Sequence, residues 1–221
     1  MSAYGDNSWN MLGGLIRGTD AYKKANLELS NRMKGSIKNP YPAGTLKNEV
    51  FDELLEDEGY RFGAYFDTKN NLTTGVGHLV TDKNAGNWVF PKDASDLLSD
   101  DIDEKYRDAI HYLTPEAFNN LSWDAKKAVI NMNFRGDLRK SPVTSELLRQ
   151  GRMSDAAKQY LINKEYEAAK SANLKGIVDR MEENARRLAI EKNPGYLNSM
   201  SISSPDASNR SHFYLKYWRP E

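Results

Sequence analysis

Apolar residues recur with helical spacing from position 51, and the pattern changes to that of a strand after position 59. Phe51, Leu54 and Leu55 stand at i, i+3 and i+4, and Glu58 follows at i+7 on the same face. Because the first three are apolar, this helix face should be buried. Gly59 comes next, and glycine most often closes a helix in the left-handed conformation. The spacing therefore predicts a helix that ends with a carboxyl group on its buried face.

Residues 60–67 alternate and include several aromatic side chains, which is typical of a strand. A turn cluster follows, and residues 72–76 can return as the paired strand. If the hairpin is centred on Asn70, Asp67 faces Thr73 directly across it. A carboxylate and a hydroxyl at that separation can hold one water molecule between them.

The rest of the chain to residue 195 has mostly helical patterns. Residues 91–113 predict one long helix, because Pro91 suits a first turn and an apolar stripe follows at helical spacing, formed by Leu97, Leu98, Ile102, Tyr106 and Ile110. Thr114 and Ser122 belong to the residue types that cap helix N-termini. They predict two more helices, and the second of these should form the core of a C-terminal lobe.

The two ends of the chain carry weaker signals. Short apolar stripes occur in residues 1–45, one formed by Trp9, Leu12, Leu15 and Ile16 and one by Leu27, Leu29 and Met33. Such stripes are typical of core packing; docking on another protein, such as a virion component, and membrane-surface binding are the alternatives. Residues 39–44 predict a linker. Residues 196–221 form a tail with an aromatic end that either packs on the fold or contacts a partner, including carbohydrate.

Composition narrows the class of protein. The chain has 221 residues, of which 39% are hydrophobic, enough for one large domain or two lobes with a sizeable core. It has no cysteine, which excludes a disulfide scaffold and a thiolate metal site. The three histidines are far apart in the sequence and give no metal-ligand spacing. We therefore expect neither a metal nor a cofactor.

Charge argues against nucleic acid as a partner. The net charge is zero, but residues 46–112 carry 7 Lys or Arg against 15 Asp or Glu, and residues 113–195 carry 15 against 11. No basic stripe with interleaved aromatic residues stands out, as a nucleic-acid surface would require. No apolar run approaches the roughly 18 residues that a membrane span needs. The first 20 residues also lack the features of a signal peptide.

Glu58, Asp67 and Thr73 together suggest a glycosidase. A carboxyl group on a buried face, beside the negative end of a helix dipole, has its charged form disfavoured twice, which keeps it protonated. Such an acid can protonate a leaving oxygen while a second carboxylate activates water, as in an inverting glycosidase. The alternative for Glu58 is a helix-end glutamate whose carboxylate simply reaches solvent.

The same residues resemble a known family. Glu58-Gly59, then Asp67-Thr68, then Thr73, then Gly75-Val76-Gly77-His78-Leu79 closely resembles, without a gap, the phage-type lysozymes (glycoside hydrolase family 24, the T-even bacteriophage endolysin class). The likeness covers roughly residues 46–192. It implies hydrolysis of the β-1,4 bond between N-acetylmuramic acid and N-acetylglucosamine in peptidoglycan, with inversion. It also implies that Glu58 is the general acid, Asp67 the base or electrostatic stabiliser, and Thr73 the hydroxyl that positions water.

The resemblance assigns roles to four further residues. Asn131 matches a substrate-contacting asparagine, although a solvated side chain is the alternative. Arg180 matches an arginine that pairs with the catalytic glutamate, although the neighbouring Met181 departs from the pattern and could signal a shifted register. His78 should pair with Asp101 as a structural contact that raises the pKa of the histidine. The alternative is a neutral His78 bonded to a backbone carbonyl.

These inferences predict an α+β, mostly α, two-lobed lysozyme-like fold with a small β-hairpin region in the N-terminal lobe. We expect an N-terminal extension and linker (1–45), a lysozyme domain (46–195) and a C-terminal tail (196–221). The domain divides into an N-terminal lobe (46–91), a connecting helix (92–113) and a helical C-terminal lobe (114–195). The sequence does not identify which residues of an insertion at 165–176 line the cleft.

The expected function is that of a muramidase, in a bacteriophage endolysin or a virion-associated lysin. Its partner would be peptidoglycan, with a possible virion protein bound through residues 1–38 or the C-terminal tail, and no nucleic acid or membrane span. Before release to the wall it would lie in the infected host cytoplasm or in the virion. The rivals are a non-catalytic structural or glycan-binding protein of the same fold and a lytic transglycosylase, which needs the glutamate but not Asp67.

Overall fold

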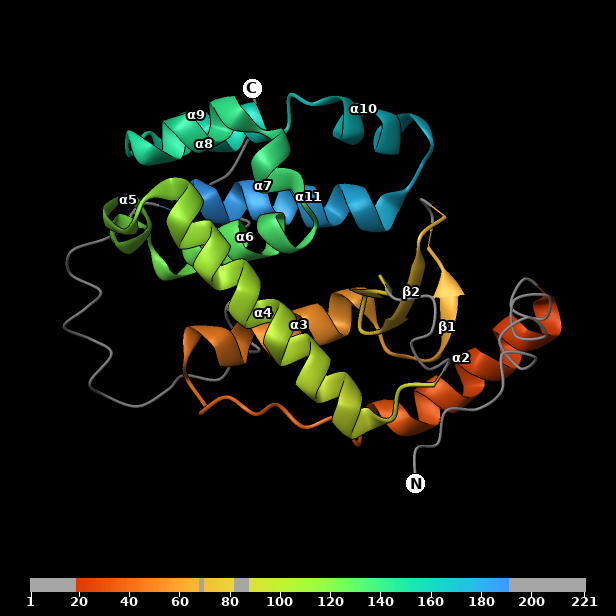
Figure 1. Ribbon diagram of the computed structural model, residues 1–221. Coiled ribbons are helices and arrows are strands. Elements are labelled where there is room, and N and C mark those ends of the chain that lie inside the picture. Colours follow the sequence, from red (N-terminus) through yellow and green to blue (C-terminus); the bar gives the residue numbers. More distant parts are fainter. Residues whose placement is uncertain (1–18, 68–69, 82–87, 191–221) are drawn as a thin grey trace, which may run out of the picture.

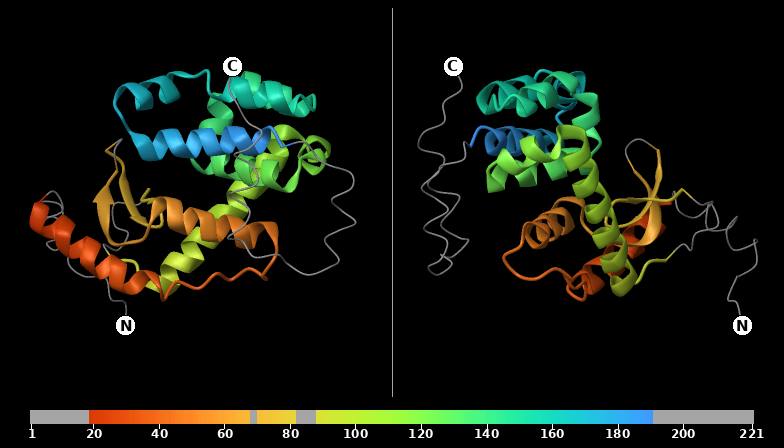
Figure 2. Two further views of the ribbon diagram at one scale, coloured as in Figure 1. Left: turned by 180° about the vertical axis from the view of Figure 1, so that it is seen from behind. Right: turned by 60° about the vertical axis from the view of Figure 1, so that its left-hand side comes forward.

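One long helix, α4 (Pro91–Leu113), connects two lobes in the computed structural model, which describes residues 19–67, 70–81 and 88–190 (Figure 1). The N-terminal lobe contains α2 (Asp20–Lys34), α3 (Leu46–Glu58) and the strands β1 (Arg61–Phe66), β2 (Leu72–Gly75) and β3 (His78–Leu79). The C-terminal lobe contains α5 (Pro115–Asn120), α6 (Trp123–Phe134), α7 (Asp137–Lys140), α8 (Pro142–Arg149), α9 (Met153–Tyr160), α10 (Lys164–Ser171) and α11 (Lys175–Leu188). The predicted α+β, mostly helical class and the two-lobed arrangement are confirmed (Figure 2).

Local sequence signals set the helix boundaries. Pro91 occupies the first turn of α4, and the hydroxyls of Thr114 and Ser122 accept the N–H groups of Ala117 and Ala125 as caps of α5 and α6. Helix α6 lies at the centre of the C-terminal lobe, and eight of its side chains are buried: Ala125, Lys127, Ala128, Val129, Ile130, Asn131, Met132 and Asn133. Because α6 is enclosed by neighbouring helices, its buried residues occupy more than one face of the helix.

The sheet is larger than the predicted hairpin, and its register differs. Strands β1, β2 and β3 form an antiparallel sheet in that order. Thr73 pairs with Tyr65 rather than with Asp67, so the centre of the hairpin lies one residue earlier than predicted. The Asp67 carboxylate accepts the Asn71 N–H at 2.7 Å and so fixes the loop length, which residue alternation alone cannot specify. Asp67 is therefore a diagonal neighbour of Thr73, on the same face of the sheet.

Helix α2 packs on the sheet with polar rather than apolar side chains. Asn26 and Ser30 are its buried residues, whereas Leu27 and Leu29 are 42% and 40% exposed. The interpretation of Leu27 and Leu29 as core residues is therefore wrong, whereas Met33 of the same stripe is partly buried against the core. The apolar spacing predicted the wrong buried face, because α2 packs on the backbone of β1. The N–H and C=O groups of that backbone need polar side chains as hydrogen-bond partners.

The segment expected to be a plain linker is attached to the N-terminal lobe. The Asn39 amide donates to Asn48 O at 2.9 Å on α3, and the Tyr41 hydroxyl donates to Asp103 Oδ1 at 2.7 Å on α4. The Tyr41 ring also meets Phe51 edge-on. These contacts join residues 39–44 to the two helices that border the lobe.

Several predictions fall outside the described residues. The stripe of Trp9, Leu12, Leu15 and Ile16 and the tail at 196–221 belong to them, and so does Thr68 of the resemblance motif. Within the part of the chain that the structure describes, no helix is both long enough and apolar enough to cross a membrane.

Candidate active site

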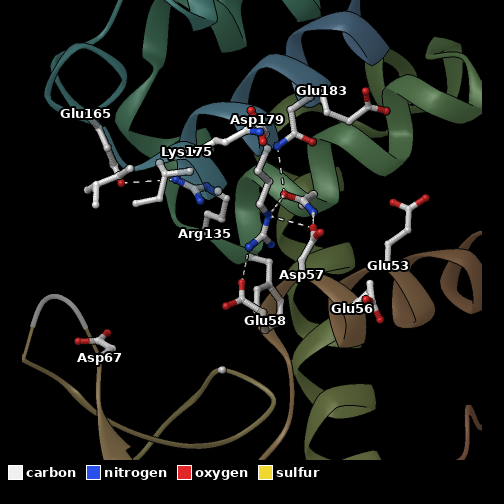
Figure 3. A pocket seen from close by; sticks show the side chains of 18 of the residues that line it. Glu53, Glu56, Asp57, Glu58, Asp67, Arg135, Glu165, Lys175, Asp179 and Glu183 are labelled. Atoms are coloured by element: carbon white, nitrogen blue, oxygen red, sulfur yellow. Dashed lines mark hydrogen bonds and ion pairs between the residues drawn. The ribbon is translucent and has the colours of Figure 1, made fainter. Parts of the chain in front are cut away.

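A cleft of about 1140 Å³ runs between the two lobes and is lined by both predicted carboxylates, Glu58 and Asp67. Its floor and walls come from α3, the hairpin, α6 and the α10–α11 region, and its further lining residues include Glu53, Glu56, Asp57, Gly77, Asn131, Arg135, Lys175, Asp179, Arg180, Glu183 and Arg187. In Figure 3, Asp67 lies on the hairpin, apart from the group of side chains that surrounds Glu58. The cleft thus has an acid on a helix end and a second carboxylate on a strand end.

Glu58 is the last residue of α3, and its side chain is 26% exposed. Gly59 follows with φ 66° and ψ 169°, so the positive φ predicted for it is present, but in an extended rather than a left-handed helical conformation. Arg180 Nη1 lies 2.5 Å from Glu58 Oε1. The pairing of Arg180 with Glu58 that the resemblance implied is therefore present, and α11 brings this guanidinium to the helix end from 122 positions away.

Arg180 belongs to a polar network at the floor of the cleft. Its Nε lies 3.0 Å from Asn131 Oδ1 and 3.2 Å from Asp57 Oδ2. Asn131 also accepts from Asn184 Nδ2 at 3.0 Å, and both asparagines are buried. Met181 is buried in the core, so the pattern on α11 has not slipped. Asn131 lines the cleft with its amide already engaged; contact with substrate stays a prediction.

Two members of this network were missed by sequence reasoning. Asp57 directly precedes Glu58, and Asn184 lies four residues after Arg180 on the same face of α11. The i, i+4 spacing on α11 was the available signal for Asn184. No sequence signal pointed to Asp57, because its partner Arg180 comes from the other lobe.

Asp67 follows the last residue of β1 and holds the turn of the hairpin. Its two carboxylate oxygens accept from Asn71 N at 2.7 Å and from Asn71 Nδ2 at 3.1 Å. Thr73 is 4% exposed, is not among the residues that line the cleft, and donates its hydroxyl to Asn71 O at 3.3 Å. The hydroxyl predicted to position water is thus engaged with the turn that holds Asp67, and its role stays a prediction.

Tyr65 is a further residue near both carboxylates. It pairs with Thr73 and shares a sheet face with Asp67. Burial raises the pKa of its hydroxyl, and the charges of Glu58 and Asp67 raise it further. The sequence places Tyr65 two residues before Asp67, on the same face of the strand, but no motif marked it as a site residue.

His78 Nδ1 lies 2.9 Å from Asp101 Oδ2 on α4, so the predicted contact is present. The hydrogen bond to Asp101 raises the pKa of His78, although partial burial acts in the opposite direction. The pair joins β3 to the connecting helix.

Ion pairs also join the lobes beside the cleft, and two of their members, Glu53 and Arg187, line it. Lys127 Nζ on α6 lies 3.0 Å from both Glu49 Oε2 and Glu53 Oε1 on α3, and Arg187 Nη1 on α11 lies 2.6 Å from Glu53 Oε2. Burial by itself lowers the pKa of Lys127, but Glu53 and Glu49 outweigh it and raise that pKa. The acidic N-terminal lobe and the basic C-terminal lobe seen in the sequence therefore meet in specific contacts.

The model of one protein family, described as Phage lysozyme, matches residues 55–184, which include both carboxylates, Asn131 and Arg180. No curated protein matches the chain. Within residues 19–67, 70–81 and 88–190, no three histidine, cysteine or carboxylate side chains converge as a metal site would require.

Proposed function

The chain belongs to the phage lysozyme family, and from this premise we propose that it is a muramidase that hydrolyses the β-1,4 bond between N-acetylmuramic acid and N-acetylglucosamine in peptidoglycan. The observation that carries the proposal is that Glu58 and Asp67 line one inter-lobe cleft from two different elements. We also assign the chain, as part of this proposal, to glycoside hydrolase family 24 and its T-even endolysin class.

Glu58 acts as the general acid and Asp67 as the base or electrostatic stabiliser. Glu58 gives its proton to the glycosidic oxygen as the bond to the sugar carbon breaks, and Asp67 takes a proton from the water that attacks that carbon from the opposite side. One water is consumed, and the anomeric configuration inverts. Thr73 contributes to the position of that water, either directly or by supporting the Asn71 turn to which it is bonded.

Arg180 sets the starting condition of this reaction. Its guanidinium lies 2.5 Å from Glu58 Oε1, an oxygen of the carboxyl group that would have to face the glycosidic oxygen. Bound glycan therefore has to displace or weaken this contact before Glu58 can serve as a proton donor. Asn131 and Asp57 hold the other side of the guanidinium and define where it can move.

The Glu58→Gln variant tests the assignment. The amide keeps the size of the side chain and loses the transferable proton, so turnover of purified peptidoglycan should fall by about 10²–10⁴-fold. Glu146→Gln on α8, far from the cleft lining, is the matched control and should keep full activity. Comparable activity of Glu58→Gln, at an unchanged melting temperature, would show that the acid is elsewhere. Asp67→Asn should lose most activity, and Thr73→Ala should lose much of it.

Product chemistry separates the proposal from its rivals. Hydrolysis leaves reducing ends, a transglycosylase leaves anhydro sugars, and a non-catalytic binding protein leaves the wall intact. Inversion predicts a separation of roughly 6.5–9.5 Å between the two carboxyl groups. NMR of the product anomer at early times tests the stereochemistry; early appearance of the retained anomer would contradict inversion.

The biological role we propose is wall degradation in a bacteriophage life cycle, as an endolysin or as a lysin of the virion. A virion partner bound through residues 1–38 or 196–221 belongs to the second role. Detection of the chain in purified particles by mass spectrometry distinguishes the two.

A further inference from the structure

We propose that α2 is a positioning element of the active site, and that it holds the strand leading to Asp67 mainly through Asn26. The inference rests on the proposed function, and it extends the site to a helix that ends 21 residues before the family match begins. It departs from the expectation that residues 1–45 form an extension and linker outside the lysozyme domain.

Three polar side chains on one face of α2 bind the backbone of β1. Tyr22, Asn26 and Ser30 stand at i, i+4 and i+8. The Tyr22 hydroxyl donates to Ala64 O at 3.0 Å, and the Ser30 hydroxyl accepts from Phe62 N at 2.9 Å. Between them, the Asn26 amide donates to the Gly63 carbonyl and accepts from its N–H, both at 2.8 Å. One side chain thus satisfies both backbone groups of Gly63, as a paired strand would.

These contacts fall where the strand pairing is irregular. The β1–β2 register shifts between Arg61 and Tyr65, so residues 62–64 lie in the interrupted section. Buried backbone groups there need partners from elsewhere, since an unpaired group costs free energy. Helix α2 supplies partners for the Phe62 N–H, both backbone groups of Gly63 and the Ala64 carbonyl. The Val89 N–H donates to Phe62 O at 2.8 Å, beside a bridge between Gly63 and Trp88, so the conformation of this section depends on α2 together with the Trp88–Val89 backbone.

The irregular section leads directly into the site. Two residues after Ala64, β1 ends at Phe66, and Asp67 follows. The far end of α2 reaches α3, where Lys34 Nζ lies 2.8 Å from Glu56 Oε2, two residues before Glu58. That pair is solvent-exposed and contributes little by itself. The buried contact of Asn26 with Gly63 is therefore the one that links α2 to the position of Asp67.

Gly63 permits the close approach of the helix. A Cβ atom at this position would lie 2.4 Å from Tyr22 Oη and 2.9 Å from the Trp88 ring. Neither distance is tolerated, so an added methyl group would displace the Tyr22 hydroxyl and the Trp88 ring, and it would crowd Asn26 Nδ2 at 3.2 Å. The same reasoning makes Gly63→Ala a second, independent way to disturb the contact.

The test compares two pairs of variants in the full chain. Asn26→Leu removes both hydrogen bonds to Gly63 while it keeps a side chain of similar size. Its control is Asn31→Leu, because Asn31 is an exposed residue of the same helix. Gly63→Ala is paired with Gly35→Ala, where an added Cβ meets nothing within 4 Å. We expect Asn26→Leu and Gly63→Ala to lower kcat on purified peptidoglycan by about 10- to 100-fold with KM nearly unchanged, because a misplaced catalytic group lowers turnover. The two controls should match the wild type.

Hydrogen exchange supplies a readout that needs no substrate. The Asn71 N–H is held by Asp67, so its protection reports on the turn that carries this carboxylate. We expect protection of Asn71 to fall in Asn26→Leu at a temperature where the protein is fully folded, and to persist in Asn31→Leu. The inference would be overturned if folded Asn26→Leu kept the wild-type kcat. It would also be overturned if kcat fell only in proportion to the unfolded fraction while the Asn71 N–H stayed protected. A wild type that leaves peptidoglycan intact would instead refute the proposed function, and the exchange result would still decide the role of α2.

Discussion

At the residue scale, His78 and Asp101 form a contact whose strength depends on pH. A histidine whose folded pKa is raised stabilises the fold fully below its unfolded pKa, about 6.5, and this contribution is lost as the pH rises through the folded pKa. His78 is partly exposed, so solvent screening limits the contribution to about 1 kcal/mol or less.

The His78→Asn variant makes this measurable. Its melting temperature should fall below that of the wild type at pH 5–6 and approach it at alkaline pH. In an Asp101→Asn background the substitution should have no pH-dependent effect. If the melting temperatures of the wild type and His78→Asn differ by the same amount at every pH while Asp101 is present, His78 is neutral and bonded to a backbone carbonyl instead.

At the scale of elements, the turn between β2 and β3 approaches the helix end that carries Glu58. Gly77 has φ +71°, and a Cβ atom there would lie 3.3 Å from Glu58 Cγ. Gly44 has a similar φ of +76°, with nothing within 4 Å of an added Cβ. The two glycines share a positive φ that would strain any residue with a Cβ, and they differ in the atoms that lie beside them.

This difference predicts the outcome of two alanine variants. Gly77→Ala and Gly44→Ala should each lose about 1–2 kcal/mol of stability, the strain of a left-handed L-residue. Only Gly77→Ala should also shift Glu58 and lower kcat, by about tenfold or more. Steady-state kinetics with thermal denaturation of both variants checks this; equal activities would mean that Glu58 adapts without loss.

At the scale of the whole molecule, a charge cluster beside the cleft joins the two lobes. The Lys127 side chain is 8% exposed, and its partners Glu49 and Glu53 come from the other lobe. Removing the buried cation leaves Glu53 with Arg187 and Glu49 with the Trp123 indole N–H as donors, and this loss of charge compensation is costly. Both glutamates remain near enough to solvent to be rehydrated in part.

Lys127→Met should therefore lose about 1–3 kcal/mol in urea unfolding, less than the loss at a fully buried pair. Lys92→Met removes an exposed pair with Asp96 on α4 and should leave the urea midpoint unchanged. If both variants unfold at the wild-type midpoint, the Lys127 contacts do not join the lobes energetically.

The sequence by itself determined most of the elements and the identity of the two cleft carboxylates. Pro91, Thr114 and Ser122 marked helix starts because a cap or a proline acts within one turn. Glu58 and Asp67 could be named because their spacing to the Gly75–His78 segment is a local motif. The contact of His78 with Asp101 was also within reach, since the resemblance supplied the partner.

Tertiary structure alone decided the environment of those residues. Asn26 binds Gly63 across 37 positions, and Asp57 meets Arg180 from the other lobe, so neither contact leaves a periodic trace in the sequence. The pairing of Arg180 with Glu58 was supplied by the resemblance. The hairpin register depended on one side-chain bond within its loop, from Asn71 to Asp67. Helix α2 was misjudged because periodicity reports apolar burial, whereas this helix docks by satisfying backbone hydrogen bonds, for which the sequence has no repeating signal.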